Sequence, residues 1–503
     1  MELKNILHKV SEVESKIECS LYRNLSNKKM TEEICQKLRK MPVSNGSAYY
    51  EKINKNIGLI SDEFIYMVYK DCCNLIYLTP QNWNDEIQKL DLVIIVSVWH
   101  GLNKEWQSAY KEGSFANEQI KMIKKEARKR DIPVVFYSKE DPPNFEIFLS
   151  LAEEVDVIFT SAEECIEKYE KKYPNIPCYH LPFAINPMLH NPIGLCNDMI
   201  NNTILFAGSW MKKYPVRTLE QKKIFSFIER VGFDLAIIDR NFRRNDRNYL
   251  YPLKYIRNIV DSFNYNEIAL IYKMFPFVLN LNSVNASNTM FANRVYDASA
   301  CGSLLLSNES KGMKTLFPEV NVIQEFSDME KLKLMSEQEL QLKRIQTIRN
   351  AYRKNTSYDN MKFIFQKVGL VWKDTSLPSV CVVLSKECQN ENKYYSYFEK
   401  QTYENKVCIS NKNMLEDIEN YDYITFWSSE QYYDEYYLED MLNGFKFTNS
   451  DFISRNENGY PMHSYINQVI CKYRTVFKVD RVNDKILKNE IEEWKGNGYS
   501  IHN

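Results

Sequence analysis

Glycine is scarce in this chain, with 14 residues among 503, which argues against a collagenous or linker-rich protein. No apolar run reaches the roughly 18 residues from which a membrane-spanning helix is inferred, and the N-terminal stretch MELKNILHKVSEVESKIEC is charged throughout, unlike a signal peptide. An excess of basic charge is also missing. The 65 Lys and Arg against 66 Asp and Glu give a formal charge of −1, so we expect no nucleic-acid partner held by a general basic surface.

Metal-ligand spacing is absent as well. The 12 cysteines are scattered, no CxxC occurs, and the 6 histidines form no HxxxH or HExxH array, so we expect no structural zinc site. Most cysteines lie in apolar settings, such as Cys301 in SACGSLLL, and are typical of small core residues. Without a signal peptide, the expected location is the reducing cytoplasm, with peripheral attachment at the inner membrane face as an alternative.

Hydrophobic patterning divides the chain into four stretches: residues 1–50, 51–195, 196–372 and 373–503. The first has helical spacing of apolar residues, namely Leu7, Val10, Val13, Ile17 and Leu21. A second short helix is expected from Met30 to Met41. We predict a helical hairpin that packs on the body or on a second subunit, which leaves a homodimer open.

The two middle stretches each alternate short apolar strands with charged, helix-prone segments. The strands of the first are NIGLI, DLVIIVSVW, PVVFYS and DVIFTS, and those of the second are TILFAGSW, FDLAIID, FPFVLNLN and GSLLLSN. This alternation predicts parallel sheets covered on both faces. We therefore expect two facing Rossmann-like α/β domains with a ligand cleft at the carboxyl ends of the strands. Residues 373–503 predict a small α/β unit with too few strands for an independent sheet.

The segment LFAGSWMKKYPVRTLEQKK predicts a diphosphate site. A strand ends before a tight Gly208-Ser209 turn, and Lys212, Lys213 and Arg217 surround the start of the next helix. Small residues let the backbone approach a phosphate, and the helix N-terminus and the basic side chains add positive potential. A GxGxxG fingerprint is absent, so an ordinary strand–turn–helix with solvated lysines is the alternative.

A second donor-site candidate is VLNLNSVNASNTMFANRVYDASACGSLLLSN. Its strand ends at Asn282, and the following helix carries Asn293, Arg294 and Asp297. Asn293 and Asp297 are four residues apart and share one helix face. A carboxylate there can accept hydrogen bonds from sugar or ribose hydroxyls, while capping and ion pairing are the alternative roles.

Candidate catalytic groups follow strands of the first domain. Glu140 and Asp141 come after PVVFYS and before two prolines, and carboxylates at such a strand end are predicted to point into the cleft as a base or a substrate-orienting group. Solvated loop acids are the alternative. His100 follows DLVIIV and is a further candidate base, given its ordinary pKa of about 6.5, although a lone histidine is more often a satisfied structural group.

Residues 55 to about 370 resemble the CgeB-like glycosyltransferases of the GT-B fold. The motifs that carry the resemblance are SDEF, YLTPQNW, VSVWHG, IPVVFYSKEDPPNFE, VDVIFTS and LPFAINPMLHNP in the first domain, and FAGSWMKKYPVR and FANRVYDASACGSLLLSN in the second. The resemblance implies a nucleotide-sugar donor, taken here as UDP-linked, bound mainly by the second domain. It also implies an acceptor bound mainly by the first domain: a glycan, polyol phosphate or protein of a cell-surface or spore-coat glycoconjugate.

Two departures from related patterns bear on the chemistry. Retaining GT-B enzymes of the group-1 type often carry Glu-x7-Glu near this helix; Asp297 occupies the first acidic position but Leu305 the second, so the stereochemical outcome stays open. The last stretch resembles the latter part of a family-2 (GT-A) glycosyltransferase, with Ser428-Ser429-Glu430 where metal-binding acids are expected. This unit is predicted to be non-catalytic and to pack, dimerise or grip the acceptor.

The sequence therefore predicts a glycosyltransferase that needs no metal and no cofactor beyond its nucleotide-sugar co-substrate. Lys212, Arg217 and the loop before Asn293 would stabilise the leaving diphosphate. The main alternative is a non-catalytic protein that binds a nucleotide sugar or glycan and assists assembly. A nucleotide-sugar epimerase is a third idea, which the motifs of the first domain do not favour.

Overall fold

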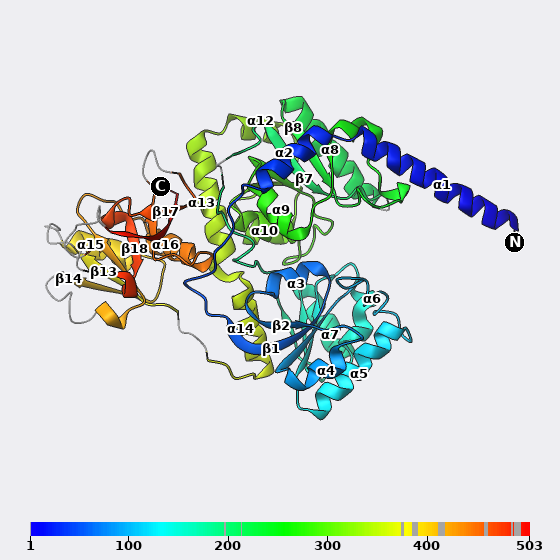
Figure 1. Ribbon diagram of the computed structural model, residues 1–503, viewed down its shortest axis with the longest axis horizontal. Coiled ribbons are helices and arrows are strands. Elements are labelled where there is room, and N and C mark those ends of the chain that lie inside the picture. Colours follow the sequence, from blue (N-terminus) through cyan, green and yellow to red (C-terminus); the bar gives the residue numbers. More distant parts are fainter. Residues whose placement is uncertain are drawn as a thin grey trace.

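The computed structural model describes residues 2–195, 198–212, 214–373, 377–384, 391–410, 418–456, 461–483, 486 and 494–502. Within these residues the strands form three sheets, two of six strands and one of seven. Figure 1 shows the first domain and the second domain facing each other, with the third sheet to one side of the second domain. This confirms the predicted α/β fold of GT-B type.

The sheet of the first domain is parallel, in the order β2-β1-β3-β4-β5-β6. Its strands are β1 Ile53–Ile60, β2 Cys73–Tyr77, β3 Leu92–Val96, β4 Val134–Ser138, β5 Val157–Thr160 and β6 Cys178–His180. Its helices are α3 Glu63–Tyr69, α4 Trp83–Glu86, α5 Phe115–Lys129, α6 Phe145–Phe148 and α7 Ile166–Lys172. Alternate residues of β3 enter two different cores, Val93 and Ile95 in one and Leu92 and Ile94 in the other. Both faces are therefore covered, which explains the continuous apolar strands.

The second domain repeats this architecture in the order β12-β11-β10-β7-β8-β9, again parallel. Its strands are β7 Thr203–Gly208, β8 Asp234–Asp239, β9 Ile259–Val260, β10 Phe277–Asn280, β11 Leu304–Ser307 and β12 Asn321–Val322. Its helices are α8 Pro215–Val231, α9 Tyr265–Tyr272, α10 Arg294–Ala300, α11 Lys311–Leu316, α12 Phe326–Leu334 and α13 Glu337–Lys354.

Helix α14, Ser357–Val368, returns the chain from the second domain to the first. The backbone N–H of Ser357 donates to the carbonyl of Ile185 at 2.8 Å, which joins this crossing to the earlier one. Met361 and Phe365 then enter the core beneath β1 and β3. Because two chain segments cross side by side, the two domains are tied together at one end of their cleft.

The third unit builds a full mixed sheet, so the expectation of too few strands is wrong. Its order is β14-β13-β15-β18-β16-β19-β17, formed by β13 Val380–Leu384, β14 Lys406–Ser410, β15 Tyr423–Trp427, β16 Phe452–Arg455, β17 Ser464–Gln468, β18 Thr475–Lys478 and β19 Lys495–Ile501. Helices α15 Glu391–Glu399 and α16 Tyr437–Lys446 accompany it. One continuous hydrophobic core contains residues of this sheet, of α16 and of the second domain.

The N-terminal segment contains α1 Glu2–Leu25 and α2 Lys28–Leu38. These helices do not fold back on each other as the predicted hairpin would, since α1 continues outward from α2 (Figure 1). The reason is the docking of the end of α1 on the second domain, where the buried Tyr22 hydroxyl donates to Asp239 at 2.9 Å. Val10, Val13 and Ile17, on the outer part of α1, are about half exposed. Among the described helices, none is both long and apolar enough to cross a membrane.

Candidate active site

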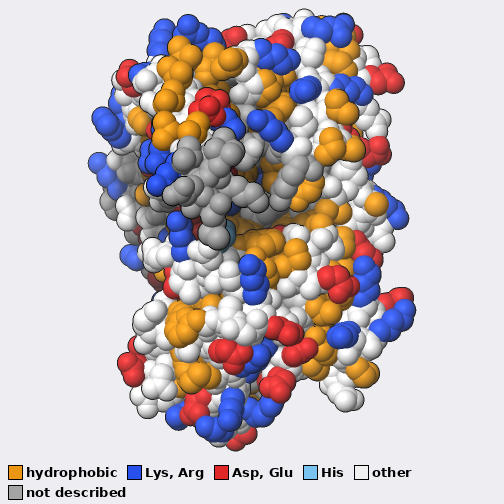
Figure 2. Space-filling view, turned by 90° about the vertical axis from the view of Figure 1, so that its right-hand side faces the viewer, with side chains coloured by type: hydrophobic (Ala, Val, Ile, Leu, Met, Phe, Trp, Pro, Cys, Tyr) orange, Lys and Arg blue, Asp and Glu red, His pale blue; other side chains and the backbone are white. Residues whose placement is uncertain are grey.

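The carboxyl ends of the two parallel sheets face each other. Thr289, in the loop after β10, donates its hydroxyl to the carbonyl of Ser161, just after β5, at 3.2 Å. Its hydroxyl oxygen also accepts from the Glu163 backbone N–H at 3.0 Å. In Figure 2 the two lobes lie one above the other, and hydrophobic side chains gather near the boundary between them. This is the edge where parallel α/β sheets bind ligands.

Two arginines of the second domain reach the end of β7. Arg217, in the first turns of α8, donates from Nη1 to the carbonyl of Ser209 at 3.3 Å. Arg294, at the start of α10, donates from Nη2 to the carbonyl of Ala207. Among the described residues neither guanidinium forms an ion pair, and the buried Nε atom of each has no hydrogen-bond partner. Burial lowers the pKa of Arg217, and the positive charge of Arg294 lowers it further.

Polar groups around the turn fix its shape. The Ser209 hydroxyl accepts from the Asn241 amide at 2.9 Å, and the Gly208 carbonyl accepts from the Tyr251 hydroxyl at 3.0 Å. Helix α8 begins at Pro215 with no side-chain cap, so its N-terminal N–H groups add positive potential beside the turn. Two guanidiniums without an ion pair among the described residues, a held turn and an uncapped helix start can together hold an anion, and we call this arrangement the candidate anion site.

The lysines predicted beside this turn differ from the arginines. Lys212 is exposed, and its ammonium donates to the carbonyl of Arg247 at 3.4 Å, on the side where α1 docks. Lys213 lies outside the described residues. The candidate anion site is therefore formed by Arg217 and Arg294, with Lys212 directed away from it.

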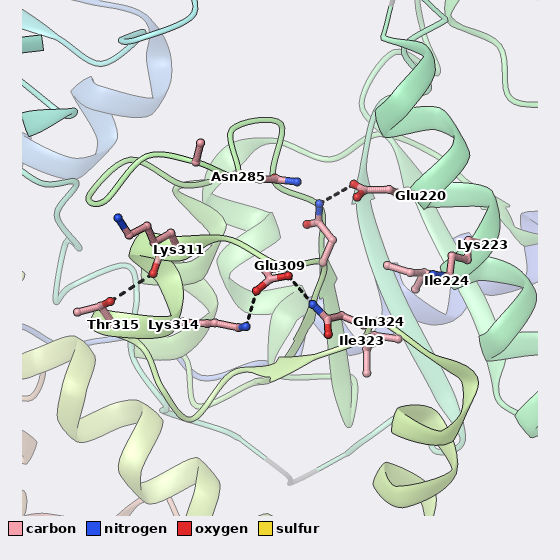
Figure 3. Close-up of a pocket in the computed structure, with 12 residues that line it drawn as sticks. Glu220, Lys223, Ile224, Asn285, Glu309, Lys311, Lys314, Thr315, Ile323 and Gln324 are labelled. Atoms are coloured by element: carbon pink, nitrogen blue, oxygen red, sulfur yellow. Dashed lines mark hydrogen bonds and ion pairs between the residues drawn. The ribbon is translucent and has the colours of Figure 1, made fainter. Parts of the chain in front are cut away.

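A cavity of about 770 Å³ opens on the carboxyl side of β11 and β12, next to α8 (Figure 3). Its lining residues are Glu220, Lys223, Ile224, Asn285, Ala286, Asn308, Glu309, Lys311, Lys314, Thr315, Ile323 and Gln324. Glu220 lies one helical turn beyond Arg217, and its carboxylate accepts from the Asn308 amide at 2.8 Å. Glu309 accepts from both Lys314 and Gln324. The cavity thus combines carboxylates, amides and cations beside the candidate anion site.

Asn282 is a structural residue rather than a ligand contact. It is buried, its side-chain oxygen accepts from the Ala292 N–H at 2.9 Å, and its amide donates to the Ser307 hydroxyl at 3.2 Å. Its own N–H donates to the Asn308 side chain at 2.7 Å. Asn282 therefore joins the ends of β10 and β11 and holds the loop that leads to Arg294.

Asn293 and Asp297 also turn away from the predicted role at the donor sugar. The Asp297 carboxylate is buried and accepts from the Asn293 amide at 2.6 Å and from the Tyr265 hydroxyl at 2.8 Å. His190, in the segment between the domains, has its Nε2 atom 3.5 Å from the other carboxylate oxygen. Burial raises the pKa of Asp297 to about 8 and, together with the charge of Lys273, lowers the pKa of His190 to about 3. The cluster fastens the interdomain segment to α9 and α10.

Asp141 does not face the cleft, which corrects its prediction as a catalytic group. It is fully buried, and one carboxylate oxygen accepts from the Thr160 hydroxyl at 2.7 Å and from the Tyr169 hydroxyl at 3.1 Å. Burial raises its pKa to about 6. The carboxylate bridges β5 and α7 in the interior of the first domain.

Glu140 and His100 stay near the carboxyl edge of the first sheet. The buried Lys139 ammonium lies 2.7 Å from Glu140 and 3.3 Å from Asp62. Asp62 in turn accepts from the backbone N–H groups of residues 99–101, which orders the loop that carries the exposed His100. The fixed charges around Lys139 hold this loop, and His100 is the accessible candidate for a base.

We expect Asp141→Asn to leave turnover unchanged and to alter stability with pH. Because its folded pKa exceeds the ordinary value, Asp141 adds stability below about pH 4 that is lost as the pH rises through 6. The asparagine cannot ionise and can accept both hydroxyl donors, so its free energy of unfolding should exceed that of the parent by up to ~3 kcal/mol at pH 7. Urea unfolding between pH 4 and 7 measures this. Glu146→Gln, at an exposed position on α6, is the control, and a hundredfold loss of turnover in Asp141→Asn would contradict the buried role.

In the third unit, Ser428, Ser429 and Glu430 follow the end of β15, where the family-2 pattern has metal-binding acids. Ser428 is buried and its N–H donates to the Tyr433 hydroxyl at 3.0 Å, while Glu430 is exposed. In the described part of the chain, no group of three or more His, Cys, Asp or Glu side chains is placed to hold a metal ion.

The sequence reasoning missed the residues of the large cavity. Asn308 is the last residue of the predicted strand GSLLLSN, and Glu220 lies three residues after Arg217 on the predicted helix. The strand-end rule used for the first domain would have found Asn308, and helical spacing would have found Glu220. Gln324 follows the two-residue strand β12, which carries too little pattern to be recognised.

Comparison with known proteins gives a consistent family signal. A family model described as glycosyl transferase-like matches residues 228–361, which include Arg294 and Asn308. The spore protein CgeB of Bacillus subtilis (strain 168) is 24% identical over 195 residues, which are 36% of this chain and 57% of that protein. The match thus spans little more than half of the curated relative. Residues 228–361 thus match a glycosyl transferase-like family model, and the chain resembles the CgeB-like glycosyltransferases, as its motifs indicated.

Solved structures with a similar fold include two glycosyltransferases. An alpha-glucosyltransferase in complex with UDP and a 13-mer DNA containing a HMU base is 14% identical, with a TM-score of 0.46, and the match covers 63% of this chain and 100% of that one. The pneumococcal O-GlcNAc transferase GtfA in complex with UDP and GlcNAc is 11% identical, with a TM-score of 0.35, covering 57% of this chain and 58% of that one.

Proposed function

We propose that this chain transfers a sugar from a nucleotide diphosphate, UDP in the first instance, to a glycan, polyol-phosphate or protein acceptor of a cell-surface or spore-coat glycoconjugate. The observation that carries the proposal is the pair of guanidiniums of Arg217 and Arg294 at the end of β7. Placing two positive charges close together costs stability in the free protein, and the pKa of Arg217 is lowered by burial and by the charge of Arg294. A dianionic diphosphate would remove that cost and satisfy the free N–H groups.

The diphosphate position also suits the neighbouring cavity. A volume of about 770 Å³ is within the range of small-molecule sites. With the diphosphate on Arg217 and Arg294, the nucleoside would lie along α8 toward Glu220 and Asn308. Carboxylate and amide groups can accept from ribose hydroxyls and pair with a base edge. Figure 3 shows Glu220 among the side chains that line this cavity.

The acceptor would bind the facing edge of the first domain. His100 is exposed there, and the Lys139 cluster holds its loop. In the proposed reaction the acceptor oxygen forms a bond to the anomeric carbon as the bond to the diphosphate breaks. The two arginines stabilise the charge that develops on the leaving group, and His100 takes the acceptor proton. No metal is required for these steps.

A non-catalytic protein that binds nucleotide sugars or glycans stays the alternative. The buried state of Asp141 favours it, because one predicted catalytic carboxylate is unavailable. Both functions share the diphosphate site, so binding alone does not separate them.

The test is a panel of UDP-, GDP- and ADP-linked sugars. At least one donor is expected to raise the melting temperature, since a ligand at a hundredfold excess over its Kd adds about 2.7 kcal/mol of stability. The same donor should be hydrolysed slowly to free nucleotide diphosphate, and EDTA should leave that rate unchanged. Stabilisation without hydrolysis or transfer would support the binding protein. A rate abolished by EDTA and restored by Mn²⁺ would contradict the metal-independent mechanism.

A further inference from the structure

A second cavity, of about 520 Å³, lies between α13 and the third unit. Its lining residues are Leu342, Ile345, Gln346, Arg349, Tyr397, Lys400, Tyr432, Tyr433, Asp434, Glu435, Tyr436, Asp440, Arg455 and His502. On α13, Arg344 donates to the carbonyl of Gly302 in the second domain, whereas Arg349 lines the cavity. Helix α13 therefore contacts the second domain on one side and this cavity on the other. Figure 1 shows the helix between the second domain and the third unit.

Tyrosine rings form much of its wall. Tyr432 is 71% exposed, and its ring stands perpendicular to that of Tyr397 with centroids 5.7 Å apart. The Tyr436 ring lies on the Arg349 guanidinium at 3.7 Å. A large apolar ring exposed at the mouth of a polar cavity and supported by a second ring can pack against a ligand at little conformational cost.

The charges in the cavity are matched. Arg349 donates to both carboxylate oxygens of Asp440, at 2.8 and 2.7 Å, and Arg455 donates to Asp434 at 2.8 Å. Paired in this way, the arginines present no net positive field to a phosphate group, which distinguishes them from Arg217 and Arg294.

Two hydrogen-bonding atoms are nevertheless left over. The Nε atom of Arg455 and the Nδ1 atom of His502 have no partner among the described residues. Both side chains are largely buried, with 11% of the Arg455 side chain and 6% of the His502 side chain exposed. A buried polar atom without a partner costs free energy, which a ligand hydroxyl would recover because it can both donate and accept.

We propose that this cavity binds a neutral sugar residue of a carbohydrate. A sugar ring offers an apolar C–H face for Tyr432 and hydroxyls for the matched acids, arginines and His502. The identification of this carbohydrate as part of the acceptor rests on the proposed function, whereas the binding itself does not. A glycan held here would be tethered to the chain at a distance from the reaction cleft.

The test is saturation-transfer NMR of the full chain with maltose, cellobiose, lactose and N,N′-diacetylchitobiose. At least one disaccharide is expected to bind. Tyr432→Ala should raise the Kd of that disaccharide at least tenfold, whereas Tyr432→Trp, which keeps an aromatic ring, should bind it as the parent does. Tyr395→Ala, at a tyrosine of α15 outside the cavity lining, should leave the Kd unchanged. Saturating UDP should not displace the sugar, and Arg294→Ala should not affect its binding.

Absence of binding by all four disaccharides, or equal binding by the parent and Tyr432→Ala, would overturn the proposal. Displacement by inorganic phosphate would overturn it too, because the cavity would then be an anion site. A chain that binds UDP but no sugar refutes this inference alone. A chain that binds a sugar through Tyr432 but no nucleotide refutes the proposed donor site alone.

Discussion

Replacing both Arg217 and Arg294 by alanine is expected to raise the Kd of UDP at least about a hundredfold. A hydrogen bond to a charged group contributes about 1.5–3 kcal/mol, and each 1.4 kcal/mol is a factor of about ten. Each single variant should therefore bind UDP with a Kd about 10- to 150-fold higher than that of the parent. The losses of binding free energy in the two single variants should not add up to the loss in the double variant, because both guanidiniums would hold one diphosphate. Isothermal titration of UDP into all three variants measures this.

The control for this experiment is Lys222→Ala, which removes an equal charge from an exposed position of α8. Lys212→Ala should also cost little, because its ammonium is solvated and directed to the carbonyl of Arg247. Melting temperatures without ligand show whether the variants stay folded. A double variant that binds UDP within about threefold of the parent would place the diphosphate elsewhere and remove the main support for the proposed function.

Arg349→Ala is expected to destabilise the docked third unit by about 3 kcal/mol, since removing one partner of a buried ion pair leaves an uncompensated charge. The pair joins α13 to α16, and the side chains of Arg349 and Asp440 are only 13% and 2% exposed. The hydrogen bonds from Arg349 and the neighbouring His502 hold the pKa of Asp440 below its ordinary range despite burial. The stability from this carboxylate is present above about pH 4 and is lost as the pH falls below that value.

The matched control is Arg243→Ala. Arg243 also donates through two nitrogens to one aspartate, Asp261, but its side chain is 74% exposed. An exposed pair contributes about 1 kcal/mol or less. Urea unfolding followed by tryptophan fluorescence, with Trp427 and Trp494 reporting on the third unit, compares the two variants at pH 7. Equal losses of unfolding free energy in the two variants would show that burial does not strengthen the ion pair of Arg349 with Asp440.

Much of the fold could be predicted because it depends on local pattern. The buried strands β3, β4 and β10 are continuous apolar runs bounded by polar residues, and such runs predict a covered parallel sheet. Several of the strands that were missed have weak patterns. β9 and β12 have two residues each, and β17, with the sequence SYINQ, is an exposed edge strand. The third sheet was therefore underestimated.

The candidate site could be predicted only in part. The glycine, serine and arginine of FAGSWMKKYPVR lie within one strand–turn–helix, so the chain's own order brings them together. Arg294 was also named as a donor-site residue, but its meeting with Arg217 depends on β10 lying beside β7. No pattern within one segment of the sequence predicts that β10 pairs with β7, because the order of strands in the sheet is decided by tertiary packing.

The sequence by itself determined the two parallel α/β domains, the position of the turn after β7 and the neutral overall charge, since periodicity and composition are properties of neighbouring residues. The tertiary structure decided which polar side chains meet. Asp141 became a buried bridge between Thr160 and Tyr169, and Asp297 turned toward His190 while its neighbour Arg294 reached β7. The direction of a side chain at a strand or helix end depends on what packs against it. Those neighbours come from distant parts of the chain, so only the folded structure separates Arg294, which reaches the end of β7, from Asp297, which is buried three residues away.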